Sequence, residues 1–99
     1  MAADWLTSQS IRGFVKLGRV QAQRTDQQHY VVLDRRRDLV TLLDPEMHPL
    51  RQEKLPSSVQ IVLESNLDLA SISIAPSGMV RGDTVRLRGR TGELEVTLQ

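Results

Sequence analysis

The sequence predicts an α+β fold in which one N-terminal α-helix packs on antiparallel β-sheets. The first quarter of the chain repeats its apolar residues with a helical period, and the rest alternates apolar and polar residues as strands do. The period changes at the polar stretch 25–28. With 99 residues the chain has the size of one small domain with one core, so we expect a single domain over residues 1–99.

The helix is expected from about residue 4 to about residue 24. One side of this segment is apolar and should form a seam against the sheets. The seam residues are Ile11, Phe14, Val15, Gly18 and Ala22, with Leu6 and Leu17 on the flank. Gly13 and Gly18 each cost about 1 kcal/mol relative to alanine inside a helix, and close approach of a sheet is the expected gain at Gly18.

The opposite side of the predicted helix is mainly basic and carries one large aromatic side chain. It comprises Trp5, Arg12, Lys16, Arg19 and Gln23. No apolar run approaches the roughly 20 residues that cross a bilayer. Because the sequence opens directly on the helical pattern, we expect that an anchor preceding the helix is missing from it.

The first half of the β body, which should extend from about residue 29 to residue 99, is rich in Val and Leu and is interrupted by turn residues. In order, we expect a strand at 30–33, a hairpin turn at 34–38, a strand at 39–43, a loop at 44–49 and a short edge strand at 50–55 ended by Pro56.

The second half of the β body shows strand alternation. The inward residues are Val59, Ile61 and Leu63, then Ala70, Ile72 and Ile74, then Val85 and Leu87, then Leu94, Val96 and Leu98, with turns at 76–78 and 90–92. In the last hairpin Arg86, Arg88 and Arg90 should face Glu93 and Glu95, and such cross-strand pairs fix the register. The body therefore has about six or seven strands.

Composition and motifs argue against an enzyme. The chain has no cysteine, and a net charge of +1 gives no whole-molecule field. His29 and His48 lie far apart without a metal-ligand spacing, and we expect them at the start of a strand and in a solvated loop. Phosphate-binding loops and a serine nucleophile elbow are missing from the sequence. Glu93 and Glu95 lie among arginines and should stay ionised and structural. We predict no catalytic site, no metal site and no cofactor.

Two groups of arginines allow a second interpretation. They are Arg35, Arg36 and Arg37 in the first turn, and Arg81, Arg86, Arg88 and Arg90 near the end. The planar guanidinium suits phosphate, so an exposed cluster could bind the DNA backbone. We favour a solvated turn flanked by Asp34 and Asp38 and a hairpin neutralised by Glu93 and Glu95. One Trp, one Tyr and one Phe leave few platforms for base stacking.

Residues 15–33 resemble the start of the soluble part of the H-type minor pseudopilins of type II secretion and the FimT-like minor pilins, the GspH/FimT family. In that family a small residue and an Arg are followed three residues later by Ala and then by a first strand, and Gly18, Arg19, Ala22 and 31–33 occupy these places. Near the end, residues 72–78 resemble the family's strand and Pro-x-Gly turn, and 84–87 and 94–98 resemble its following strands.

The resemblance implies a pilin-like fold without an active site, in which the helix continues a membrane anchor preceded by a cleaved prepilin leader. It implies a non-catalytic subunit of a type II secretion pseudopilus or type IV pilus-like filament, anchored by a single pass in the bacterial inner membrane with this domain in the periplasm. Its partners would be other pseudopilins or pilins, contacted through Trp5, Arg12, Lys16 and Arg19, the membrane through the missing helix, and a secreted substrate. The alternative is a DNA-binding minor pilin used in DNA uptake through Arg81 to Arg90.

Overall fold

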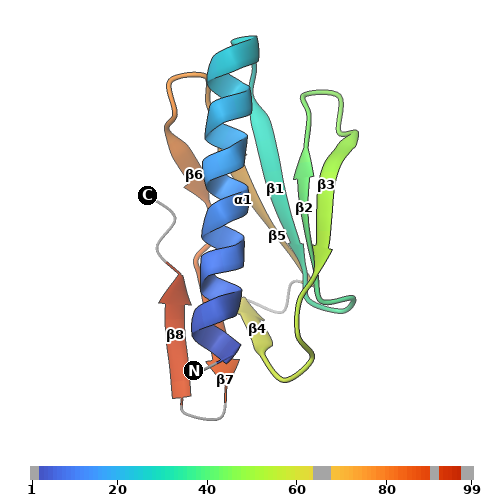
Figure 1. The fold of residues 1–99 in the computed structure, drawn as a ribbon, viewed down its shortest axis with the longest axis vertical. Helices are drawn as coiled ribbons and strands as arrows, with labels where there is room; N and C mark the ends of the chain where they lie inside the picture. Colours follow the sequence, from blue (N-terminus) through green and yellow to red (C-terminus); the bar gives the residue numbers. More distant parts are fainter. Residues whose placement is uncertain (1–2, 64–67, 90–91, 97–99) are drawn as a thin grey trace.

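The computed structural model describes residues 3–63, 68–89 and 92–96. Helix α1 (Ala3–Thr25) runs along the long axis of a body measuring 40 × 24 × 21 Å (Figure 1). It ends in a left-handed cap, where Asp26 has a φ of 55° and the N–H of Gln27 donates to the carbonyl of Ala22 at 3.2 Å. Among the described residues, no helix has the length and hydropathy to cross a membrane.

The strands form two antiparallel sheets. The five-stranded sheet has the order β3-β2-β1-β5-β6, with β1 (His29–Asp34), β2 (Leu39–Leu43), β3 (Pro49–Lys54), β5 (Leu69–Ile74) and β6 (Val80–Gly82). The three-stranded sheet has the order β4-β7-β8, with β4 (Gln60–Leu63), β7 (Val85–Gly89) and β8 (Gly92–Val96). In the described ranges, strands pair only within their own sheet.

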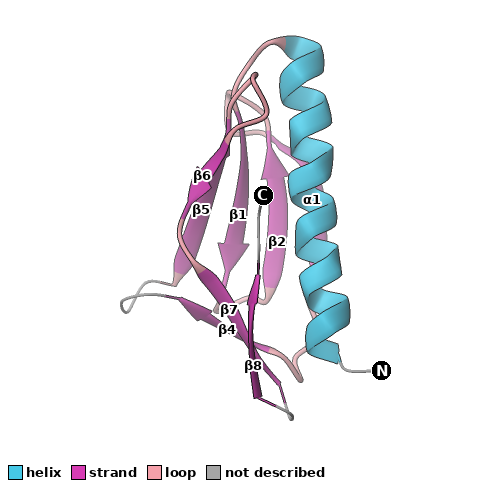
Figure 2. Ribbon diagram, turned by 90° about the vertical axis from the view of Figure 1, so that its left-hand side faces the viewer, coloured by secondary structure: helices cyan, strands magenta, loops and turns pink. Residues whose placement is uncertain are grey.

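One face of each sheet turns toward α1, and the hydrophobic core lies between these faces and the helix (Figure 2). Helix α1 contacts β1, β2 and β5 of one sheet and β7 and β8 of the other. The register brings Val31 opposite both Leu42 and Ile72, so three fully buried side chains from three strands form one row. The alternation of buried and less buried residues along β1, β2 and β5 is thus the pattern that a sheet covered on one face requires.

The predicted α+β fold, with one N-terminal helix on antiparallel sheets, is confirmed, and the strand count is corrected to eight in the described part of the chain. The additional strand is β6, where only Val80 is buried and no alternation marks the sequence. It forms by pairing Val80 and Gly82 with Ile74 and Ile72 of β5. The expected edge strand is β3, one residue earlier than predicted. Arg90, Thr91 and Leu98 lie outside the described residues.

Candidate assembly surface

The seam of α1, defined as Ile11, Phe14, Val15, Gly18 and Ala22, is buried throughout. Its closest approach to the five-stranded sheet is at Gly18, where a Cβ would lie inside van der Waals contact of Ile74 Cδ1 and 3.2 Å from Leu42 Cδ1. Glycine therefore lets the helix lie close to the sheet without displacing the ends of these two side chains. Because the side of α1 that carries Gly18 packs against the sheet, the opposite side of the helix remains exposed.

The flank of the seam differs from the expectation at one residue. Leu17 is half-buried and packs against the core, whereas Leu6, expected beside it, is 48% exposed. Leu6 lies seven residues before Gly13, and two helical turns return it to the same outward direction. Thr7 and Ser8 are buried at this turn of the helix instead.

The predicted basic face lies on the side of α1 opposite the buried seam. Trp5 is 49% exposed, and Arg12 and Lys16 are exposed. Arg19 is half-buried, and its Nε donates to the carbonyl of Gly78 at 3.2 Å, which joins the helix to the turn between β5 and β6. Arg19 of the basic face therefore contacts another part of the same chain.

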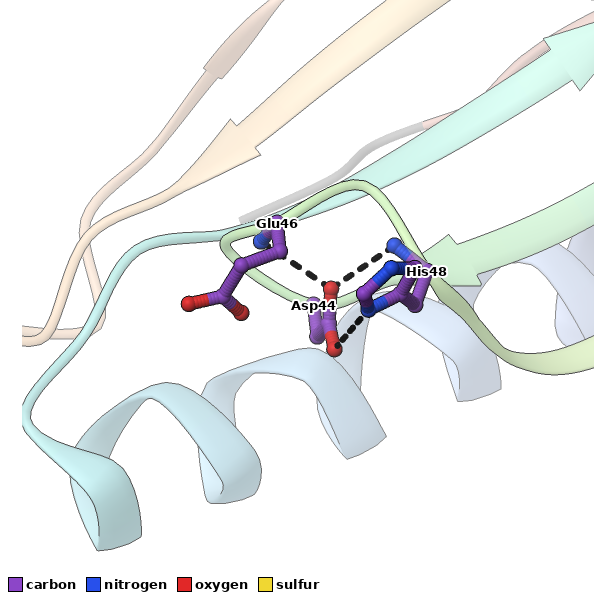
Figure 3. A group of neighbouring side chains, drawn as sticks. All are labelled: Asp44, Glu46 and His48. Atoms are coloured by element: carbon purple, nitrogen blue, oxygen red, sulfur yellow. Dashed lines mark hydrogen bonds and ion pairs between the residues drawn. The ribbon is translucent and has the colours of Figure 1, made fainter.

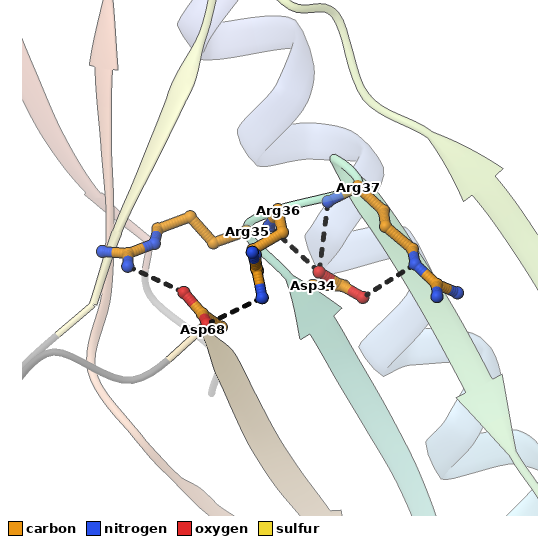
Figure 4. A network of polar contacts seen from close by, with 5 residues as sticks. All are labelled: Asp34, Arg35, Arg36, Arg37 and Asp68. Atoms are coloured by element: carbon orange, nitrogen blue, oxygen red, sulfur yellow. Dashed lines mark hydrogen bonds and ion pairs between the residues drawn. The ribbon is translucent and has the colours of Figure 1, made fainter.

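The arginines of the β1–β2 turn are held by two aspartates (Figure 4). Asp34 Oδ1 accepts the backbone N–H groups of Arg36 and Arg37 at 3.0 and 3.1 Å, which closes the turn. The Arg35 side chain donates to Asp68 Oδ1 at 2.9 Å, and its backbone N–H donates to the carbonyl of Asp68 at 2.8 Å. The sequence interpretation named Asp34 and Asp38 as flanking acids and missed Asp68, which lies 33 residues from Arg35 and gives no local signal.

The second arginine group is divided between the two sheets. Arg81 lies on β6, whereas Arg86 and Arg88 lie on the solvent side of β7, and Arg90 is outside the described residues. Arg88 donates through Nη2 and Nε to Glu93 Oε1 at 2.6 and 3.1 Å. The register places Arg86 opposite Glu95. The local charge of β7 is thus balanced by β8.

The two histidines differ in burial and in their contacts. His29 begins β1 with only 2% of its surface exposed, and its Nδ1 lies 3.1 Å from the carbonyl of Gln27, to which a protonated Nδ1 donates. His48 is exposed and pairs with Asp44 in the β2–β3 loop, Nδ1 to Oδ2 at 3.5 Å.

Asp44, Glu46 and His48 bring one potential ligand atom each to within 4.8 Å of one another (Figure 3). Asp44 Oδ1, however, accepts the backbone N–H groups of Glu46 and His48 at 3.0 and 2.7 Å, so this carboxylate closes the loop. Glu46 and His48 are exposed, and the cluster is explained as a solvated Asp-stabilised turn. The alternating Asp-x-Glu-x-His spacing of residues 44–48 is the sequence signal of this cluster.

Comparison with protein-family models and with curated proteins finds no match. Two solved structures are similar. The type IV minor pilin FimU of Pseudomonas aeruginosa has a TM-score of 0.65 at 9% identity, over 87% of this chain and 72% of that chain. The minor pseudopilin EpsH of the Vibrio cholerae type 2 secretion system has a TM-score of 0.54 at 12% identity, over 95% of this chain and 96% of that one. The chain therefore has the fold of a minor pilin or pseudopilin.

Proposed function

We propose that this chain is a non-catalytic structural subunit, a minor pilin or minor pseudopilin, of a type IV pilus-like or type II secretion filament. The observation that carries the proposal is the fold, in which one long helix packs on two antiparallel sheets and which is similar to the solved structures of a minor pilin and a minor pseudopilin. The subunit enters the filament through its N-terminal helix and is held in the bacterial inner membrane by a preceding anchor, with this domain in the periplasm.

The proposed contacts with neighbouring subunits lie on the outer side of α1. Arg12 and Lys16 are exposed there, and Trp5 presents half of its surface. The opposite side of the helix is committed to the core, so contacts made by this part of α1 use the outer side. Arg19 supports this surface through its bond to Gly78.

The test uses the full-length gene in its native host, with an epitope tag at the C-terminus. We expect the tagged protein in the inner membrane and in sheared filament fractions, where it co-purifies with the host's other pilins or pseudopilins. A tagged protein found only in the cytoplasm, or a native gene that encodes no prepilin leader and apolar helix, would contradict the proposal.

A further inference from the structure

The outer side of α1 carries a second apolar stripe, distinct from the seam. Leu6, Gly13 and Val20 recur every seven residues, and Leu17 lies four residues after Gly13. We call these residues the outer stripe. Leu6 and Val20 are 48% and 52% exposed, and Leu17 is half-buried. A seven-residue repeat with an intermediate apolar position is the pattern of a helix that packs along another helix.

Gly13 destabilises the helix, and no close packing at this position offsets the cost within the described part of the chain. A Cβ at Gly13 would meet no atom within 4 Å, in contrast to the crowded Cβ position at Gly18. Glycine in a helix interior is unfavourable relative to alanine. Because the position is open to solvent, the lack of a side chain leaves room for a neighbour to approach the helix backbone.

A groove lies beside the outer stripe, between α1 and the exposed edge strand β3. It has a volume of about 320 Å³ and is lined by Ser10, Gly13, Phe14, Leu17, Arg51 and Glu53. Phe14 and Leu17 give it apolar lining, and Arg51 forms a wall with its guanidinium carbon 5.8 Å from the centre of the Phe14 ring. All six residues of β3 are exposed, so the strand leaves this side open.

The charges around the outer stripe indicate which kind of partner this surface would bind. Residues 5–25 contain Arg12, Lys16, Arg19 and Arg24 and no acidic residue, and the charges of Arg51 and Glu53, which line the groove, offset each other. Within the described ranges, Arg12, Lys16 and Arg24 form no ion pair. A second copy that presented the same face would bring like charges together, which is unfavourable, whereas acidic residues would complement them.

We propose that the outer stripe and its groove dock an amphipathic helix that carries Asp or Glu beside its own apolar stripe. This inference rests on the proposed function, because it identifies the partner as a helix of another filament subunit. Side chains of that helix enter the groove at Gly13, and its acidic residues pair with Arg12, Lys16 and Arg24.

The first experiment titrates the 99-residue chain with two designed helical peptides of about the length of α1. Both carry the same leucine and alanine heptad stripe, and the flanking positions are glutamate in one and lysine in the other. We expect the glutamate peptide to bind at least about tenfold more tightly than the lysine peptide, and to weaken as salt is raised. Equal affinities, or no binding of the glutamate peptide, would overturn the proposal.

The second experiment changes the docking surface without harming the fold. Gly13→Leu fills the open position, so we expect a higher Tm together with a loss of at least about tenfold in affinity for the glutamate peptide. The double substitution Arg12→Glu and Lys16→Glu should reverse the preference toward the lysine peptide. Leu69→Gln, at a leucine on β5 that is 53% exposed, is the matched control and should bind as the wild type does. Wild-type affinity in Gly13→Leu would refute the assignment.

Sedimentation of the chain alone tests whether a second copy of the chain binds the outer stripe. Self-association that Gly13→Leu abolishes would assign the surface to a second copy and overturn the acidic-helix proposal, and a monomer supports it. If the glutamate peptide fails to bind while the tagged full-length protein still appears in filament fractions, the inference falls and the proposed function stands. If the tagged protein is also absent from those fractions, both fall.

Discussion

Gly18 and Gly13 lie in one helix and differ in what surrounds them. At Gly18 the nearest atoms belong to Ile74 and Leu42, both fully buried, and at Gly13 the space is open. We expect Gly13→Ala to raise the free energy of unfolding by up to about 1 kcal/mol. Gly18→Ala should lower it by about 1–3 kcal/mol, because overpacking outweighs the gain in helix propensity. Urea denaturation measures both, and a Gly18→Ala variant more stable than the wild type would contradict the close approach.

Asp68 is the residue that connects the β1–β2 turn to the start of β5. Its carboxylate pairs with Arg35 at 2.9 Å and with Arg36 at 3.8 Å, and these groups are partly exposed. We expect Asp68→Asn to cost only about 0.2–1 kcal/mol of unfolding free energy, because water screens the pair. Chemical denaturation in urea at low and high salt should show the difference shrinking at high salt. Glu46→Gln, at an exposed residue of the β2–β3 loop, is the control and should leave stability unchanged.

At the residue scale, periodicity located the seam because a buried helix face leaves its spacing in the sequence, and Gly18 could be interpreted by its place on that face. Leu6 was misplaced because it is apolar and near the seam, although seven residues put it in line with Gly13. Asp68 could not be found, since a contact between residues 33 apart depends on the folded sheet.

The C-terminal cap of α1 makes a prediction at the scale of the element. Asp26 adopts a φ of 55°, a region that glycine enters without a steric penalty. We expect Asp26→Gly to raise the free energy of unfolding by about 0.5–1 kcal/mol, because the bond from Gln27 to Ala22 is kept while the strain is removed. Thermal unfolding followed by circular dichroism checks it. Asp26→Val should be destabilising, and equal stability of the two variants would contradict the cap.

Among the elements, the strands with regular alternation and the exposed edge strand β3 were predicted, whereas β6 was not. β1, β2 and β5 alternate buried and less buried residues, which the sequence shows directly. β6 has one buried side chain and exists through its bonds to β5. The separation into two sheets also depends on strand pairing, which hydrophobic patterns do not encode.

The molecule as a whole should unfold as one unit, because α1 supplies buried side chains to both sheets. Ile11 is fully buried, and we expect Ile11→Ala to cost about 2–5 kcal/mol of unfolding free energy. Amide hydrogen exchange should give the same free energy of opening for the core strands β1 and β7, since these strands belong to different sheets and both contact α1. Separate values would show that one sheet unfolds independently.

The pairing of arginines in the β body predicts weak interaction of these arginines with nucleic acid. Arg88 is paired with Glu93, Arg86 faces Glu95 and Arg35 is paired with Asp68. We expect no salt-sensitive binding of duplex DNA at physiological ionic strength, measured by fluorescence anisotropy at two salt concentrations. Glu93→Gln with Glu95→Gln is the informative comparison, because it uncovers the β7 arginines. Salt-sensitive binding by the wild type that increases in this double variant would support the DNA-uptake alternative.

The attachment of one helix to two sheets whose described strands do not pair with each other has a mechanical consequence. A pull on the N-terminal end of α1, along the long axis of the body, loads its contacts with both sheets in shear, so the packing of many side chains must yield together. The force at which α1 detaches depends on the unfolding rate rather than on the equilibrium stability. In an optical-trap experiment we therefore expect α1 to detach at higher force when pulled lengthwise than when peeled away sideways from Thr25.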